Sequence, residues 1–175
     1  MARWLAALLR NEIMPPNDDD WLTVDIQIDE TFAPLVDAEA IVAAVRHTLD
    51  TVGIDGAVEV SIVLTTDEVV RELNRVYRGQ DKATDVLSFG QDDGGPLLPP
   101  DLPRLLGDVV IAYPQVAAQA GRAGWDAQDE LVWLVIHGVL HLLGYDDADE
   151  AGRAAMWAMG EQILGRRAPG GPTDG

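Results

Sequence analysis

The chain contains no cysteine among its 175 residues. This absence excludes disulfide bonds, thiolate zinc sites, iron–sulfur clusters and thiol nucleophiles. Any metal ion must therefore bind through nitrogen and oxygen atoms. A chain without cysteine also suits a reducing compartment, and we expect a cytoplasmic location.

Hydrophobic runs long enough to cross a membrane are lacking as well. The longest apolar stretch, 131–144, is interrupted by two histidines and is shorter than the roughly 20 residues that a spanning helix needs. The apolar segment at 4–9 is too short for the core of an ordinary signal peptide, and no small-residue cleavage site follows it. We therefore expect no membrane association and no export.

Positive charge is scarce in this sequence. Lysine and arginine together number 12 against 30 aspartates and glutamates, which gives a formal net charge of −18. Because nucleic-acid binding places cations against phosphates, this balance disfavours a non-specific nucleic-acid binder, and we expect no binding to DNA.

The pattern of apolar residues predicts both strands and helices. Alternation or short apolar runs predict strands over 21–28, 58–64, 85–89 and 105–112. Helical spacing predicts helices over 37–52, 66–79, 114–123, 126–143 and 149–164. The helix over 126–143 is apolar around most of its circumference, which is typical of a buried element. We therefore predict an α+β fold, with a small mixed sheet of about four strands packed on a buried central helix.

The length of the chain suits one core of ordinary size, so we expect a single domain over residues 21–165. Residues 1–20 are expected to form a mobile N-terminal extension. Residues 166–175 are rich in glycine and proline, and we expect them to form a disordered tail.

Two histidines lie four residues apart on the predicted central helix. Four residues correspond to about 400° of rotation, so His137 and His141 share one face, one turn apart, where both imidazoles can bind one metal ion. A single buried histidine is more often a hydrogen-bonded core residue. Two of them at this spacing, followed by a glycine break at Gly144, favour a metal site.

The turn at Gly144 can bring Tyr145, Asp146 or Asp147 back toward the same ion. The wider pattern H-x-x-x-H-x-x-G-x-x-[H/D] places Asp147 at the third ligand position. Three protein ligands leave a fourth position for water, which is the arrangement of catalytic zinc. We therefore predict one Zn²⁺ per chain, held by His137, His141 and Asp147. Metalloproteases with this spacing carry a glutamate as general base directly after the first histidine, where this chain has Gly138, so proteolysis is disfavoured.

A short cationic stripe stands out against the acidic background. Arg71, Arg75 and Arg78 share one face of a predicted helix, and Lys82 continues the stripe. Arg71 and Arg75 could simply pair with neighbouring glutamates. Arg78 lies at the end of the helix, where its guanidinium could reach a phosphate oxygen, and it is our candidate for catalytic stabilisation of charge.

Two aspartates, Asp85 and Asp108, begin or interrupt apolar strands. Each could orient a ligand histidine or an arginine, or could merely cap the strand end. The sequence leaves both readings open.

Several segments together resemble the YbeY family of bacterial endoribonucleases, also called ribosomal RNA maturation factors. The similarity lies in Glu72–Arg78, Thr84–Phe89, Leu106–Ile111 and His137–Asp147, and extends from about residue 24 to residue 164. It implies a zincin-like α+β fold, a zinc ion, and hydrolysis of single-stranded RNA in 3′-end maturation of small-subunit ribosomal RNA and in ribosome quality control. By motif position, His137 and His141 match the first two zinc ligands of the family, and Arg78 matches an arginine implicated in activity.

The resemblance departs from the family pattern at the third ligand, which is usually histidine and is Asp147 here. A carboxylate lowers the net charge of the metal site and could change the preferred metal. Two alternatives to the nuclease remain: a metal-stabilised module that binds the small ribosomal subunit or a ribosomal protein without turnover, and a metallopeptidase with an unusual base. The first of these also suits the charge of −18.

Overall fold

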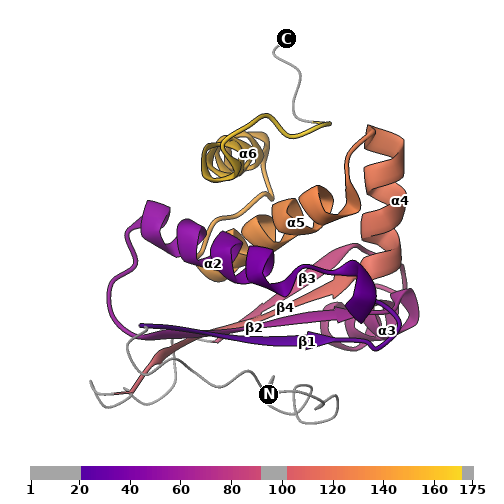
Figure 1. Ribbon diagram of the computed structural model, residues 1–175, viewed down its shortest axis with the longest axis horizontal. Helices are drawn as coiled ribbons and strands as arrows, with labels where there is room; N and C mark the ends of the chain where they lie inside the picture. The colour runs from indigo at the N-terminus through magenta and orange to yellow at the C-terminus, as the bar shows by residue number, and fades with distance from the viewer. Residues whose placement is uncertain (1–20, 92–101, 171–175) are drawn as a thin grey trace.

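A computed structural model describes residues 21–91 and 102–170. Within these ranges the chain forms a four-stranded sheet with helices on both faces (Figure 1). The strands are β1 (Leu22–Ile28), β2 (Val58–Thr65), β3 (Val86–Gly90) and β4 (Arg104–Ala112). The helices are α2 (Ala38–Val52), α3 (Asp67–Arg78), α4 (Tyr113–Ala123), α5 (Ala127–Leu142), α6 (Glu150–Leu164) and the short 3-10 helix η1 (Ala33–Leu35). The predicted α+β class is confirmed, and η1 is the element that the pattern did not predict.

The sheet has the strand order β1-β2-β4-β3. β1 pairs with β2 and β2 with β4 in parallel, whereas β3 runs antiparallel to β4 and forms one edge. The parallel pairs require crossover connections, and the amphipathic helices α2 and α3 lie in those connections. The sheet is therefore mixed, as predicted.

Side chains alternate between two cores, one on each face of the sheet. Ile62, Leu64, Val109 and Ile111 face the larger core, which contains apolar residues of α2, α5 and α6. The intervening residues of the same strands, such as Val110, face a smaller core under α3. Because both faces are covered, β2 and β4 read as almost continuous apolar runs.

Helix α5 lies at the centre of the larger core. It packs beside α2 over the sheet, and α6 lies on its far side (Figure 1). Asp126 caps its N-terminus by accepting a hydrogen bond from the amide of Gln128. After its polar first turn, the helix is apolar except at His137 and His141 and at the small residue Gly138. This placement confirms the predicted buried central helix.

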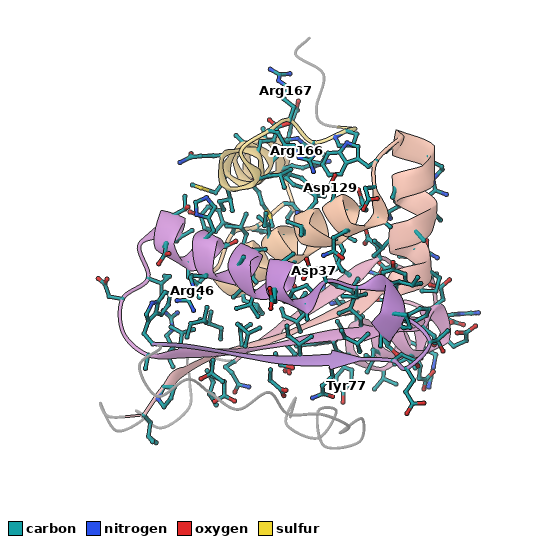
Figure 2. The ribbon with its side chains drawn as sticks, in the orientation of Figure 1. Asp37, Arg46, Tyr77, Asp129, Arg166 and Arg167 are labelled. Carbon is teal, nitrogen blue, oxygen red and sulfur yellow. The ribbon has the colours of Figure 1, made fainter. Side chains whose placement is uncertain are left out.

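The segment that follows α6 packs back on the domain. Arg166 forms an ion pair with Asp129 on α5 at 2.5 Å, a contact that can be followed in Figure 2, and its guanidinium lies over the ring of Trp125. The amide of Ala168, which is 8% exposed, donates to the Glu161 carboxylate. Residues 166–170, assigned above to a tail, are thus in contact with α5 and α6. The expected N-terminal extension at 1–20 lies outside the described residues, as do 171–175. None of the described helices is long and apolar enough to span a membrane.

Candidate metal centre

His137 and His141 occupy consecutive turns on one face of α5. Their Nε2 atoms are 3.1 Å apart, and their rings meet edge to face with centroids separated by 4.7 Å. Both side chains are about one quarter exposed, at 24% and 27%. The helix thus presents two imidazole nitrogens toward one point at its C-terminal end, as the four-residue spacing predicts.

The chain reverses directly after the second histidine. Gly144 has a φ of +95°, which favours glycine, and its amide donates to the His141 carbonyl. The amide of Tyr145 donates to the Leu140 carbonyl, which closes the turn. The turn returns Asp147 to the histidines, and its Oδ2 lies 3.7 Å from each Nε2.

The geometry distinguishes among the three residues that could have supplied a third ligand. The Asp146 carboxylate accepts a hydrogen bond from the amide of Ala148, so it is held in the local turn. Tyr145 contributes its backbone carbonyl, which lies 3.1 Å from Nδ1 of His141. Only the Asp147 carboxylate joins the two imidazoles within the described part of the chain.

These three side chains suit a divalent metal ion in number, chemistry and spacing. Their ligand atoms all lie within 4.8 Å of one another. Ligand atoms about 2.0–2.1 Å from a tetrahedral zinc ion are separated by roughly 3.3 Å, and the observed separations of 3.1 and 3.7 Å bracket that value. The carbonyl of Tyr145 can accept the Nδ1 proton of His141, which leaves Nε2 of that ring unprotonated for a metal.

Burial favours the neutral imidazole that a metal ligand must be. Desolvation lowers the pKa of His137, and the neighbouring His141 lowers it further, while the carboxylates of Asp147 and Asp85 act in the opposite direction. A divalent cation bound by two imidazole nitrogens and one carboxylate would retain a net positive charge there.

Arg78 lies at the C-terminus of α3 and is connected to α5 through the edge strand β3. Its Nη2 donates to the Ser88 carbonyl at 2.9 Å, and the Ser88 hydroxyl donates to the Gly138 carbonyl at 3.0 Å. Gly138 follows His137 directly. Two hydrogen bonds thus couple the exposed guanidinium of Arg78 to the helix that carries the histidines.

The other arginines of the predicted cationic stripe are paired with carboxylates. Arg71 forms an ion pair with Asp81 at 2.7 Å, and Arg75 with Glu72 at 2.5 Å. The pairing of Arg75 had been considered from sequence, whereas Asp81 was not foreseen as the partner of Arg71. Arg78 differs from both because its guanidinium donates to the neutral carbonyl of Ser88, and no described carboxylate pairs with it.

Close packing explains why glycine follows the first histidine. A Cβ atom at Gly138 would lie 2.4 Å from Cγ1 of Val109 on β4 and 3.3 Å from Oγ of Ser88 on β3. The position faces the sheet, so a glutamate there would have no room. The chain therefore lacks both the general base of the metalloproteases and the space for one.

Neither of the two strand aspartates bonds to a ligand histidine or to Arg78. Asp85 accepts hydrogen bonds from the amide of Val86 and from Nε2 of Gln119, and its charge reaches His137 only through space. Asp108 alternates with Val109, which faces α5, so it lies on the opposite face of the sheet. There burial raises its pKa.

A cavity of about 270 Å³, which was not predicted from the sequence, adjoins His137. Its lining includes Glu130, which lies two turns before His137 on the same face of α5. Glu130 is 7% exposed, and burial raises its pKa. A glutamate within an apolar helical pattern, seven residues before a ligand histidine, was the signal that could have indicated this cavity.

Comparison with known proteins agrees with this architecture. The family model described as Endoribonuclease YbeY matches residues 25–168. A relative from Roseiflexus castenholzii, named Endoribonuclease YbeY, is 47% identical over 150 residues, covering 85% of this chain and 94% of its own. A relative of the same name from Chloroflexus aurantiacus is 41% identical and covers 81% of this chain and 92% of its own. The solution structure of the Thermotoga maritima protein TM1509 superimposes with a TM-score of 0.52 at 26% identity, over 81% of this chain and 87% of that one. The chain therefore belongs to the YbeY family of endoribonucleases.

Proposed function

We propose that this protein is a zinc-dependent endoribonuclease that cleaves single-stranded RNA. Family membership supports hydrolysis of RNA. The observation that supports a metal is the convergence of two imidazole nitrogens and one carboxylate oxygen within 4.8 Å. Zinc is our choice among divalent metals because it accepts mixed nitrogen and oxygen ligands in low coordination numbers. Residues 21–165 would constitute the catalytic domain.

Each residue of the site has a separate task in this proposal. His137, His141 and Asp147 would hold the ion, and Tyr145 would keep the His141 ring in the required tautomer through its carbonyl. A bound zinc ion supplies a Lewis acid that polarises a phosphate oxygen and makes water more acidic.

Arg78 would stabilise the negative charge that develops on the phosphate during hydrolysis. Among the described residues its guanidinium has no carboxylate partner, and it donates to the carbonyl of Ser88 on β3, the strand whose Ser88 hydroxyl bonds to the metal-binding helix. A planar guanidinium can donate two parallel hydrogen bonds to phosphate oxygens. Such positioned donors typically contribute about 10²–10³ in rate.

The RNA substrate proposed is ribosomal, with a role in 3′-end maturation of the small-subunit RNA and in ribosome quality control. This part rests on the family resemblance. The net charge of −18 suits it, because an acidic protein that binds naked RNA weakly can still meet its substrate through a basic ribosomal protein. The same charge also favours the second candidate, a metal-stabilised assembly module that binds the small subunit without turnover.

The test is cleavage of a labelled single-stranded RNA by protein purified from a nuclease-deficient host. Four samples are compared: zinc-loaded wild type, chelated wild type, His141→Ala and Arg78→Ala. We expect cleavage only by the first, with a duplex of the same sequence left intact. Equal cleavage in all samples would reveal a contaminating nuclease. A folded, zinc-loaded wild type that cleaves nothing but binds small subunits would favour the assembly module.

A further inference from the structure

The cavity beside His137 has a mixed polar and aromatic lining. Its floor and walls come from β3, α4, α5 and α6, and its polar and aromatic lining residues are Asp85, Gln119, Glu130, Trp133, His137 and Trp157. The Trp133 and Trp157 rings lie against each other with centroids 4.8 Å apart. A Cβ at Gly160 would lie 2.7 Å from the Trp133 ring, so the backbone of α6 fixes that ring in place. The cavity is thus bounded by rigid elements.

Glu130 brings a buried carboxyl into this cavity. Only 7% of the residue is exposed, and among the described residues no hydrogen bond or ion pair to its carboxyl is present. Burial raises its pKa, and the nearby charge of Asp85 raises it further. A hydrogen-bond donor that entered the cavity would relieve both effects.

Trp157 provides a second polar group without a partner. Its Nε1 atom is buried and has no hydrogen-bond partner within the described part of the chain. Trp157 also lines the cavity, where its ring lies beside that of Trp133. A suitable ligand therefore offers donors to the carboxyls and a flat apolar surface to the tryptophan rings.

The charge of the lining excludes a phosphate from the cavity. Asp85 and Glu130 would repel an anion within the cavity. His137 borders the cavity and joins His141 and Asp147, which do not line it, so the metal site adjoins the cavity and suits a phosphate. Glu130 and His137 are separated by two turns of α5, about 10.5 Å along the axis. A nucleotide can span such a distance with its phosphate at the histidines and its base in the cavity.

We propose that this cavity binds one nucleobase of the RNA substrate, and that Glu130 and Asp85 select bases that carry an exocyclic amino group. The proposal rests on the RNA-cleaving function above. Adenine, cytosine and guanine each present an amino donor next to a ring or carbonyl acceptor, and a carboxylate is a good partner for such a donor. Uracil presents a carbonyl at the corresponding position and would be repelled.

The first test compares cleavage of oligo(A), oligo(C) and oligo(U) with that of a mixed-sequence RNA. One good base contact discriminates between two bases by about 5- to 150-fold. The kcat/KM of wild type should therefore be at least about 5-fold higher for oligo(A) or oligo(C) than for oligo(U). Glu130→Gln keeps the shape of the side chain but adds a hydrogen-bond donor. The preference for oligo(A) and oligo(C) over oligo(U) should therefore shrink, while the variant still cleaves the mixed-sequence RNA. Glu39→Gln, an exposed change on α2, is the matched control and should retain the wild-type preference. Equal cleavage of all homopolymers, unchanged in Glu130→Gln, would overturn the proposal and leave the nuclease intact.

The second test measures binding without turnover. The indole N–H signal of Trp157, assigned with Trp157→Phe, is followed by NMR as cytidine or uridine 5′-monophosphate is added. A shift with the cytidine nucleotide, weaker by at least about 5-fold in affinity with the uridine nucleotide, would support the proposal even if no RNA were cleaved. An unmoved signal, or the same shift with both nucleotides, would overturn it whatever the nuclease assay gives.

Discussion

Helix α5 lies close against the sheet at Gly138, and replacing this residue by alanine tests the geometry of the site. The added Cβ would lie 2.4 Å from Cγ1 and 3.1 Å from Cγ2 of Val109, a side chain that is completely buried. Neither Val109 nor the backbone of β4 has space to withdraw, because both are packed in the larger core. The helix must therefore move away from the sheet.

The expected cost is the difference between two opposing effects. Overpacking of this kind destabilises a protein by about 1–3 kcal/mol, whereas alanine gains up to about 1 kcal/mol over glycine in a helix. Gly138→Ala should thus reduce the free energy of unfolding by about 0–2 kcal/mol. For a domain of this size that corresponds to a decrease in Tm of up to about 8 °C.

Gly121→Ala on α4 is the matched control. A Cβ at Gly121 would have no atom within 4 Å, so this variant should show only the helical gain, a rise of up to about 4 °C. Differential scanning calorimetry of both variants gives the comparison. If Gly138→Ala stabilised the protein as much as Gly121→Ala, the close approach of α5 to β4 would be refuted. Gly138→Ala should also reduce RNA cleavage more than Gly121→Ala does, because His137 moves with the helix.

Further predictions concern the metal, the arginine and two titrating groups. At a zinc concentration 100-fold above Kd, the free energy of unfolding of wild type should rise by about 2.7 kcal/mol, or roughly 5–11 °C in Tm. Asp147→Ala should be stabilised much less at the same zinc concentration. An equal stabilisation would exclude this carboxylate as a ligand. Arg78→Lys keeps the charge but loses the planar fork, so kcat should fall while the zinc-induced rise in Tm is unchanged; a reduced rise would mean that Arg78 supports the metal site instead. The lowered pKa of His137 means that the unfolded chain binds a proton at this residue more readily than the folded chain does. Metal-free protein should therefore lose stability as the pH falls below about 6.5. In urea titrations, His137→Gln should lose less stability over the same pH range. The raised pKa of Glu130 has the opposite effect on stability. The stability that the protonated carboxyl contributes is fully present below about pH 4.3 and is lost as the pH rises through the folded pKa. Glu130→Gln should therefore be more stable than wild type at pH 8 and similar at pH 4, and equal stability at both pH values would contradict the burial of Glu130.

Much of the architecture was predictable because it depends on local patterns. Alternation over 21–28 predicted β1, and helical spacing over 37–52 and 66–79 predicted α2 and α3, which end at Gly53 and Gly79 with positive φ. The boundaries of the predicted strands and helices differ from the observed ones by at most one residue. The periodicity that marks each element lies within its own segment, so the sequence indicates it directly.

The metal centre was predictable for the same reason. His137 and His141 are related by helical geometry alone, and a glycine at 144 permits a turn of positive φ. The sequence restricted the third ligand to a few residues after that turn. The local hydrogen bond of Asp146 with the amide of Ala148, which leaves Asp147 to face the imidazoles, became evident only in the folded structure.

Contacts between distant segments were decided by the tertiary structure. The sequence alone determined that a buried helix carries two histidines and ends in a turn toward an acid, because those features arise within one segment. It did not determine that Arg78 reaches α5 through Ser88, that a glutamate at 138 would collide with β4, or that Glu130 and Trp157 meet in one cavity. Each of these depends on how α3, α6 and the sheet pack against α5, and packing of segments far apart in the chain leaves no periodic signal in any one of them.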